Sequence, residues 1–178
     1  MSPPEHIETP RCLLRKPRPG DAEPAFHAYA SDVEALRYLH WRPNANVAET
    51  AAFLSYSLHR WLKGTAWTYS ICSKRDRTAI GLIELEPAGH RARLGFVLAR
   101  THWGQGLMSE TAAAVLVHTL RLPGMARVDA LCDVNNPASA RVLEKIGMQF
   151  EGRLARYLVH PNAGTQPRDA LMYCALRA

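Results

Sequence analysis

The sequence predicts an α/β (α+β) fold, a mixed and mostly antiparallel sheet with helices on both faces. Three strand-like segments follow one another between residues 67 and 98, joined by short polar turns, as in an antiparallel meander. After the meander, helix-like and strand-like segments alternate, and this order adds crossover connections to the sheet. The 178 residues contain no linker or internal repeat, so we expect residues 1–178 to form a single domain.

Hydrophobic periodicity places seven strands and four helices along the chain. The expected strands cover residues 11–15, 67–73, 78–86, 91–98, 127–132, 149–159 and 169–176. The expected helices cover residues 21–31, 46–64, 107–122 and 136–147. The last helix has the clearest ends, because Asn136 can cap its N-terminus, Pro137 suits its first turn and Gly147 follows its end.

The chain is basic, with a formal net charge of +6 at pH 7. Its arginines are spread over the whole length and are not interleaved with aromatic residues, so we do not expect nucleic acid as a partner. A basic surface serves a small polyanionic ligand equally well. The charge alone therefore does not identify the ligand.

The four cysteines, Cys12, Cys72, Cys132 and Cys174, are far apart and form no C-x-x-C pair. We therefore expect reduced, mostly buried thiols, and neither disulfides nor a metal site. No apolar run approaches the roughly 20 residues of a membrane helix, and the N-terminus lacks the pattern of a secretory signal. We expect a cytoplasmic protein without a membrane partner.

The segment Trp103–Met108 reads W-G-Q-G-L-M and lies where a strand gives way to a helix. Glycines two residues apart allow backbone N–H groups to turn toward one point, and the helix dipole adds positive potential there. Such a site binds a phosphate or pyrophosphate without a lysine. The alternative is that Gly104 and Gly106 only make a tight turn, and this stretch alone does not decide between the two.

A dinucleotide-binding fingerprint is the competing interpretation of these glycines. That fingerprint requires a third glycine and a strand that ends directly before the first one. Here Ser109 stands at the third position, and the strand that ends at Leu98 stops several residues before Gly104. We therefore do not expect a dinucleotide fold.

A second polar group, Asn136-Pro137-Ala138-Ser139, opens the helix that follows the strand 127–132. Asn136 and Ser139 would both face a ligand at that helix N-terminus. Helix capping explains the same residues, with Asn136 as the N-cap and Ser139 at the third helical position. From residue chemistry alone, capping is the stronger interpretation.

Taken together, the two segments resemble the GNAT superfamily of acetyltransferases. The likeness is carried by L-G-F-V-L at 94–98, W-G-Q-G-L-M-S-E at 103–110 and N-x-x-S-x-R-V-L-E-K-x-G-M at 136–148. It is most similar to the RimJ/RimL-type branch, which includes ribosomal-protein N-terminal acetyltransferases, and it covers nearly the whole chain. The resemblance implies a GNAT fold whose seven-stranded sheet splays between strands 4 and 5, and acetyl-CoA as cosubstrate without a metal.

The resemblance also implies which residues hold acetyl-CoA. The strand before the glycine turn pairs with the pantetheine arm in such enzymes, which assigns Phe96, Val97 and Leu98 to this contact. The pyrophosphate is held through the backbone of Trp103, Gly104, Gln105, Gly106, Leu107 and Met108. Asn136 would contact the cofactor arm, and Ser139 would lie near the sulfur and donate a hydrogen bond to it.

Two positions depart from the family pattern. Thr101 stands where the superfamily signature has Gln or Arg, although this is common in the RimJ/RimL-type branch. Arg93 stands where many relatives carry an acidic residue just before the cofactor strand. An acid–base role therefore does not carry over to position 93.

Glu84 is our candidate for the general base. It alternates with Ile83 and Leu85 in the middle of a strand, where a partly desolvated carboxylate would have a raised pKa. The alternative is that Glu84 lies on a solvated face or pairs with an arginine such as Arg93. Most of the eight histidines are expected at the surface.

The expected activity is acetyl transfer from acetyl-CoA to a primary amine, either a protein N-terminus or a small molecule, by direct attack on the thioester. A backbone N–H of Val97 or Leu98 would stabilise the oxyanion. Tyr38 and Trp41 would wall the acceptor site beside Glu84, and core packing is the alternative for Trp41. A non-catalytic coenzyme A-binding sensor and a nucleic-acid-binding protein are the competing functions, and the resemblance makes a homodimer a candidate assembly.

Overall fold

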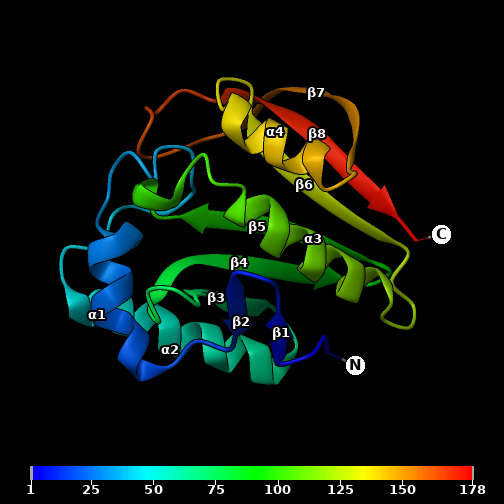
Figure 1. Ribbon diagram of the computed structural model, residues 1–178. Coiled ribbons are helices and arrows are strands. Elements are labelled where there is room, and N and C mark those ends of the chain that lie inside the picture. Colours follow the sequence, from blue (N-terminus) through cyan, green and yellow to red (C-terminus); the bar gives the residue numbers. More distant parts are fainter. Residues whose placement is uncertain (1, 178) are drawn as a thin grey trace.

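The structure is a computed structural model that describes residues 2–177. One open sheet of eight strands runs through the molecule in the order β1-β2-β3-β4-β5-β6-β8-β7 (Figure 1). Neighbouring strands are antiparallel except β5 and β6, which are parallel. The mixed, mostly antiparallel sheet predicted from the sequence is confirmed.

The elements lie close to their predicted positions. The strands are β1 (His6–Glu8), β2 (Cys12–Arg15), β3 (Trp67–Ser73), β4 (Ala79–Ala88), β5 (Arg91–Leu98), β6 (Arg127–Asp133), β7 (Gln149–Leu158) and β8 (Arg168–Leu176). The α-helices are α1 (Ala22–Ala25), α2 (Val47–Lys63), α3 (Leu107–Leu120) and α4 (Pro137–Lys145). Three short segments are η1 (Pro19–Asp21) and η3 (Arg100–His102), both 3₁₀, and the π-helical η2 (Phe26–Ala30).

The predicted count of seven strands is wrong, because β1 is an additional strand at the edge of the sheet. It pairs antiparallel with β2, with Ile7 opposite Leu14. Only Ile7 of its three residues is buried, and one buried residue gives no alternating pattern. The helix expected over 21–31 also differs, since the four-residue α1 continues as the π-helical η2.

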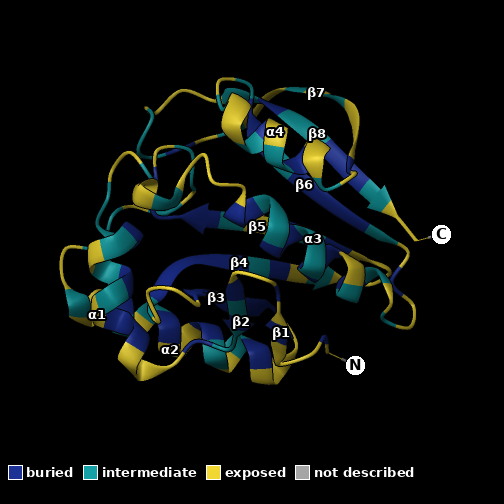
Figure 2. Ribbon diagram, in the orientation of Figure 1, coloured by how far each residue is buried: buried dark blue, intermediate teal, exposed yellow. Residues whose placement is uncertain are grey.

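Helices cover both faces of the sheet, as the sequence predicts (Figure 1). On one face, Val115 of α3 and Leu143 of α4 share a buried cluster with Ile83 of β4. On the other face, Leu54 of α2 packs with Leu82 of β4. Successive strand residues point to opposite faces of the sheet. The side chains of Leu82 and Ile83 therefore belong to different clusters. In Figure 2 the central strands are largely buried, while exposed residues lie on loops, on outer helix surfaces and on the edge strand β7.

The parallel strands β5 and β6 separate part-way along their length. β5 pairs with β4 down to its last residue, Leu98. It pairs with β6 only from Arg91 to Leu94, so residues 95–98 have no strand partner on that side. The sheet therefore opens at the carboxyl end of these two strands, which are the fourth and fifth predicted strands, and the predicted splay is confirmed.

Local sequence explains the ends of the long helix α2. Asn46 Oδ1 accepts a hydrogen bond from the N–H of Glu49 at 3.0 Å, and Glu49 Oε2 accepts one from the N–H of Ala45 at 2.8 Å. The first bond satisfies a donor that the first helical turn leaves free, and the second holds the residue before the cap. At the other end, Gly64 adopts a φ of 67° and stops the helix.

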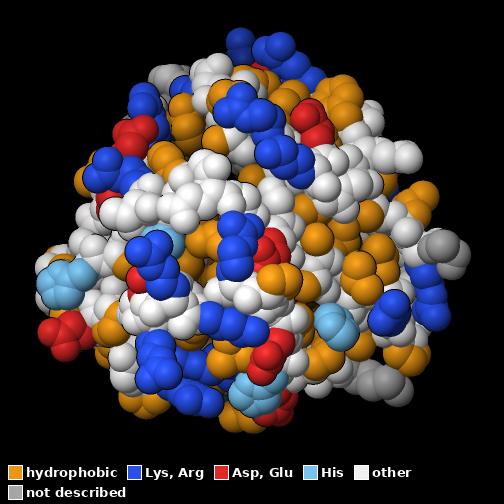
Figure 3. Space-filling model, viewed as in Figure 1, with side chains coloured by type: hydrophobic (Ala, Val, Ile, Leu, Met, Phe, Trp, Pro, Cys, Tyr) orange, Lys and Arg blue, Asp and Glu red, His pale blue; other side chains and the backbone are white. Residues whose placement is uncertain are grey.

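Three further expectations concern bulk properties of the chain. All four cysteines are buried and unpaired, as predicted. Among residues 2–177, no helix has both the length and the apolar character that spanning a bilayer requires. Figure 3 shows Lys and Arg side chains over much of the visible face, mixed with acidic and hydrophobic ones. The basic charge therefore forms no single continuous patch on that face.

Candidate active site

The glycine turn forms the N-terminal mouth of α3. Gly104 and Gly106 have φ values of 74° and 75°, in the left-handed region that favours glycine. Gly106 is the N-cap, and no side chain caps the helix. The first helical bond runs from the N–H of Glu110 to the carbonyl of Gly106 at 3.0 Å, so the N–H groups of residues 107–109 have no helical acceptor. An uncapped helix N-terminus of this kind binds anions.

Arg11, just before β2, holds this turn in place. Its Nη1 donates to the carbonyl of Gln105 at 2.8 Å, and its Nε donates to Glu110 Oε2 at 2.6 Å. Its Nη2 lies 3.7 Å from the position that a Cβ would take on Gly106, which places a cation beside the uncapped amides. Arg11 and Glu110 are 99 positions apart, so no local sequence pattern signals this contact.

The free edge of β5 leads into the turn. Val97 and Leu98 have buried side chains, and Phe96 packs partly buried against the main core. The indole Nε1 of Trp103 donates to the carbonyl of Leu98 at 2.8 Å, so that carbonyl is already occupied. An added strand would therefore pair with the backbone of β5 before this carbonyl.

The N-terminus of α4 lies at the same end of the sheet, because α4 follows β6 and β6 runs parallel to β5. Asn136 Oδ1 accepts a hydrogen bond from the N–H of Ser139 at 3.2 Å, so the capping interpretation is confirmed for Asn136. The side chain of Ser139 is half-buried. Within residues 2–177 its hydroxyl forms no hydrogen bond, and it is free to serve a ligand.

Glu84 of β4 lies directly opposite Gly95, the first residue of β5 beyond its pairing with β6. Its carboxylate accepts hydrogen bonds from Arg60 Nη1 at 3.0 Å and from Thr68 Oγ1 at 2.5 Å. Arg60 Nη2 also donates to Glu86 at 2.6 Å. The ion pair considered from the sequence is therefore present, with Arg60 of α2 as the partner.

The loop between η2 and α2 carries the two predicted acceptor residues. Asn162 holds this loop, because its Nδ2 donates to the carbonyls of Leu36 at 2.8 Å and Trp41 at 2.7 Å. Trp41 stacks on Phe53 with ring centroids 5.8 Å apart, so it also takes part in core packing. Tyr38 is half-buried.

A polar cluster that the sequence did not predict lies next to Tyr38. His160 is 5% exposed and meets Tyr38 edge-on, with ring centroids 6.0 Å apart. Its Nε2 lies 3.4 Å from Asp133 Oδ2, and Arg168 Nη2 donates to Asp133 Oδ1 at 3.1 Å. Among the described residues, neither ring nitrogen has a hydrogen-bond partner. Burial lowers the pKa of His160 and Asp133 opposes this effect, so the ring is neutral near pH 7.

A family model described as acetyltransferase (GNAT) domain matches residues 11–149. This range runs from just before β2 to the first residue of β7, so it contains both helix mouths and the separated strands. The chain belongs to the GNAT acetyltransferase family. The family expected from the sequence is confirmed, and the W-G-Q-G and N-x-x-S segments lie at one end of the sheet.

Relatives of this GNAT chain cover nearly its whole length. YoaA of Bacillus subtilis, an uncharacterized N-acetyltransferase, is 28% identical over 174 residues and is matched over 96% of each chain. The crystal structure of a GNAT-family acetyltransferase from Bacillus anthracis has a TM-score of 0.83 at 26% identity, covering 97% of this chain and 98% of that one. RimL, the ribosomal L7/L12 alpha-N-protein acetyltransferase in complex with coenzyme A, has a TM-score of 0.85 at 22% identity, with the same coverage. The likeness to RimL shows a shared fold.

The GNAT structure thus brings most of the predicted site residues to one end of the sheet. The glycine turn, the β5 edge and Ser139 lie near the point where β5 and β6 separate. Glu84 lies on the neighbouring strand β4, opposite Gly95. Tyr38 contacts His160, and His160 lies next to Asp133 at the end of β6. The residues for which the sequence predicted no role are those that hold this arrangement together: Arg11, Arg60, Thr68, Asp133, His160 and Asn162.

Proposed function

We propose that this GNAT acetyltransferase moves the acetyl group of acetyl-CoA to a primary amine, a protein N-terminus or a small molecule, by direct attack on the thioester. One observation carries the proposal: two helices begin, and two parallel strands separate, at the same end of the sheet. This arrangement suits an elongated ligand with phosphates at one end and an amide-containing arm. The complex of RimL, a chain of the same fold, with coenzyme A supports this ligand.

The proposed ligand contacts follow from the free groups of the site. The backbone N–H groups at the mouth of α3, from Gly104 to Met108, would hold the pyrophosphate, with Arg11 as a neighbouring cation. The N–H of Trp103, which the sequence also suggested, already donates to the carbonyl of Arg100 at 3.0 Å. The open edge of β5, from Phe96 to Leu98, would pair with the pantetheine arm. The Oδ1 atom of Asn136 serves the helix cap, which leaves its Nδ2 to contact the arm.

The residues near the separated strands would then carry out the transfer. Acetyl-CoA supplies a thioester carbonyl carbon, which accepts the lone pair of the amine. A backbone N–H of Val97 or Leu98 would stabilise the oxyanion that forms. Ser139 would donate a hydrogen bond to the sulfur while the C–S bond breaks. The proton of the amine would pass to Glu84, directly or through water, and the departing thiolate would take a proton from solvent.

Glu84 can accept this proton on a lone pair that its hydrogen bonds leave free. In the structure Arg60 and Thr68 each donate to one oxygen, and each carboxylate oxygen has two lone pairs. Because Arg60 also binds Glu86, it can remain paired when it releases Glu84. The acceptor that needs the least help is an α-amine, whose pKa is near 8 compared with about 10.4 for lysine. This chemistry favours a protein N-terminus among the candidate acceptors.

Thiol release from acetyl-CoA in the presence of a panel of peptides and small amines tests the proposal. We expect acceptor-dependent thiol release, with the acetyl group found on the amine by mass spectrometry. Ser139→Ala should lower kcat about tenfold through the lost hydrogen bond to sulfur. Ser109→Ala, at the same helical position of α3, should affect only the affinity for coenzyme A. If the protein binds coenzyme A but no acceptor causes thiol release from acetyl-CoA, the proposal is contradicted and a non-catalytic coenzyme A-binding sensor is favoured.

A further inference from the structure

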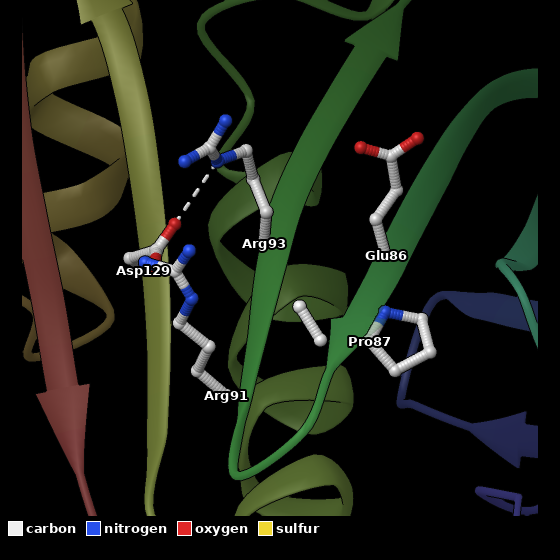
Figure 4. Close-up of a pocket in the computed structure, with 6 residues that line it drawn as sticks. Glu86, Pro87, Arg91, Arg93 and Asp129 are labelled. Carbon is white, nitrogen blue, oxygen red and sulfur yellow. Dashed lines mark hydrogen bonds and ion pairs between the residues drawn. The ribbon is translucent and has the colours of Figure 1, made fainter.

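A pocket of about 280 Å³ lies on the sheet face that carries Glu84, below the point where β5 and β6 separate. Its lining residues come from the strands β4, β5 and β6: Glu86, Pro87, Ala88, Arg91, Arg93 and Asp129. Figure 4 shows Arg91 and Arg93 on β5 at one side, with Glu86 on β4 at the other. The pocket is therefore polar and has cations on one wall.

A buried carboxylate fixes the two arginines. The Asp129 side chain is 2% exposed, and it accepts a hydrogen bond from Arg93 Nε at 3.1 Å. Arg91 Nη1 lies 3.8 Å from the other oxygen. The Arg91 and Arg93 side chains are nevertheless 52% and 41% exposed. One carboxylate thus orients two guanidinium groups that remain accessible from solvent.

The charge of this arginine pair is not fully balanced within the pocket. Asp129 supplies one negative charge for two cations. The third nearby arginine, Arg127, is bound by both oxygens of Glu151. Glu86, on the opposite wall, shares Arg60 of α2 with Glu84, so one negative charge remains in excess on that wall. The β5 side of the pocket therefore has a surplus of one positive charge and favours an anionic group.

The arginine pair lies on the same face of the sheet as the proposed point of transfer. Arg91, Arg93 and Gly95 alternate along β5 and so share one face of the sheet. Glu84 lies opposite Gly95 on the neighbouring strand and shares this face. A Cβ added to Gly95 would meet no atom within 4 Å, so the face of the sheet is open at Gly95 itself. At about 3.3 Å per residue, Arg93 and Arg91 lie roughly 7 and 13 Å before Gly95.

We propose that the arginine pair Arg91–Arg93 binds a carboxylate of the acceptor, and that preferred acceptors are N-terminal peptides with Asp or Glu a few residues after the amine. This inference rests on the proposed function. An extended peptide also advances about 3.3 Å per residue, so a side chain two to four residues after the amine spans the distance to the pair. The amine then lies near Glu84, and the acidic side chain lies near the cations. Guanidinium groups bind carboxylates through paired, charge-assisted hydrogen bonds.

The competing explanation is that both arginines only neutralise Asp129. Arg93 does serve this purpose through its hydrogen bond, and its removal would leave a buried charge without its main partner. Arg91, half-exposed and 3.8 Å away, contributes little to that balance. Arg91 is therefore the residue that separates peptide binding from a structural role.

The test uses steady-state kinetics with saturating acetyl-CoA and a matched set of N-terminal peptides that carry Asp, Asn or Lys at position 3, 4 or 5. For the wild type we expect the highest kcat/KM for Asp at one of these positions and the lowest for Lys. The difference should arise from the KM for the peptide. Arg91→Gln should reduce the preference for Asp over Asn about five- to tenfold, with kcat and the KM for acetyl-CoA unchanged. Arg91→Glu should reverse the order and favour Lys.

The control is Arg121→Gln, which removes an exposed arginine at the end of α3. It should leave the peptide preference unchanged. Equal kcat/KM for the Asp and Asn peptides, or equal effects of Arg91→Gln and Arg121→Gln, would overturn the inference while the acetyltransferase function stands. If no peptide or small amine is acetylated, the proposed function fails and the inference fails with it.

Discussion

The two ends of the proposed site are built differently. At the mouth of α3, the binding groups are backbone amides of one short segment, shaped by the positive φ angles of Gly104 and Gly106. At the acceptor end, the groups are side chains that meet from distant parts of the chain. Asn162, for example, holds the carbonyl of Leu36 across 126 positions of sequence.

This difference explains why the ligand at one end could be anticipated and the acceptor could not. A backbone site depends on a local pattern that any chain with the same turn reproduces. A side-chain site depends on long-range packing, which changes with each sequence. We infer that the α3 end supplies what the family has in common, and that the acceptor end determines which amine this chain uses.

If the α3 end is a backbone site, a single side chain in the turn should disable it. Gly106→Val introduces roughly 1–2 kcal/mol of left-handed strain and misplaces charge-assisted hydrogen bonds worth about 1.5–3 kcal/mol each. Together these should weaken coenzyme A binding about a hundredfold, as measured by calorimetry. Gly124→Val, at the other end of α3 with a φ of 78°, should lower the melting temperature to a similar extent and leave the affinity unchanged. Equal affinities in the two variants would contradict a backbone site.

If Glu84 accepts the proton of the amine, its charge should matter more than its ion pair. Glu84→Gln should lower kcat about tenfold or more, as expected for the loss of a general base. Glu86→Gln is the matched control, because Glu86 binds the same Arg60 and lies farther from the separated strands. It should retain most of the activity. Equal losses in the two variants would reduce Glu84 to a partner of Arg60.

If the acceptor end depends on side chains that hold loops together, removing the side chain of Asn162 should weaken binding of the acceptor and not binding of coenzyme A. Asn162→Ala leaves two carbonyls without their donor, a loss of about 1–3 kcal/mol. We expect a several-fold rise in the KM for the acceptor and an unchanged affinity for coenzyme A. Asn44→Ala, in the same loop, should change neither value. A change in coenzyme A affinity alone would disagree with this division of the site.

His160 should give the acceptor end a dependence on pH that the cofactor end lacks. Burial lowers its pKa in the folded protein, and Asp133, Arg168 and His40 are the charged or titratable groups nearby. The unfolded chain then binds the proton more readily, so stability is full above the ordinary pKa of about 6.5 and falls as the pH drops below it. We expect the melting temperature to fall between pH 7 and pH 5, with a flatter profile in His160→Gln. An unchanged slope in that variant would show that other groups carry the effect.

Much of the fold was predictable because its signals are local. The glycines that end helices, the Asn136 cap and the alternation in β4 and β5 all act within a few residues. The short edge strand β1 was missed because only Ile7 is buried. The burial of His160 and the contact of Arg11 with Gln105 were missed for another reason: each depends on segments that only the complete fold brings together.

A crystal structure with coenzyme A bound tests the central proposal most directly. We expect the pyrophosphate to accept hydrogen bonds from the N–H groups of residues 104–108, and the pantetheine arm to lie along β5 between Gly95 and Leu98 with its sulfur near Ser139. A ligand bound elsewhere, with the mouth of α3 empty or filled by side chains, would contradict it.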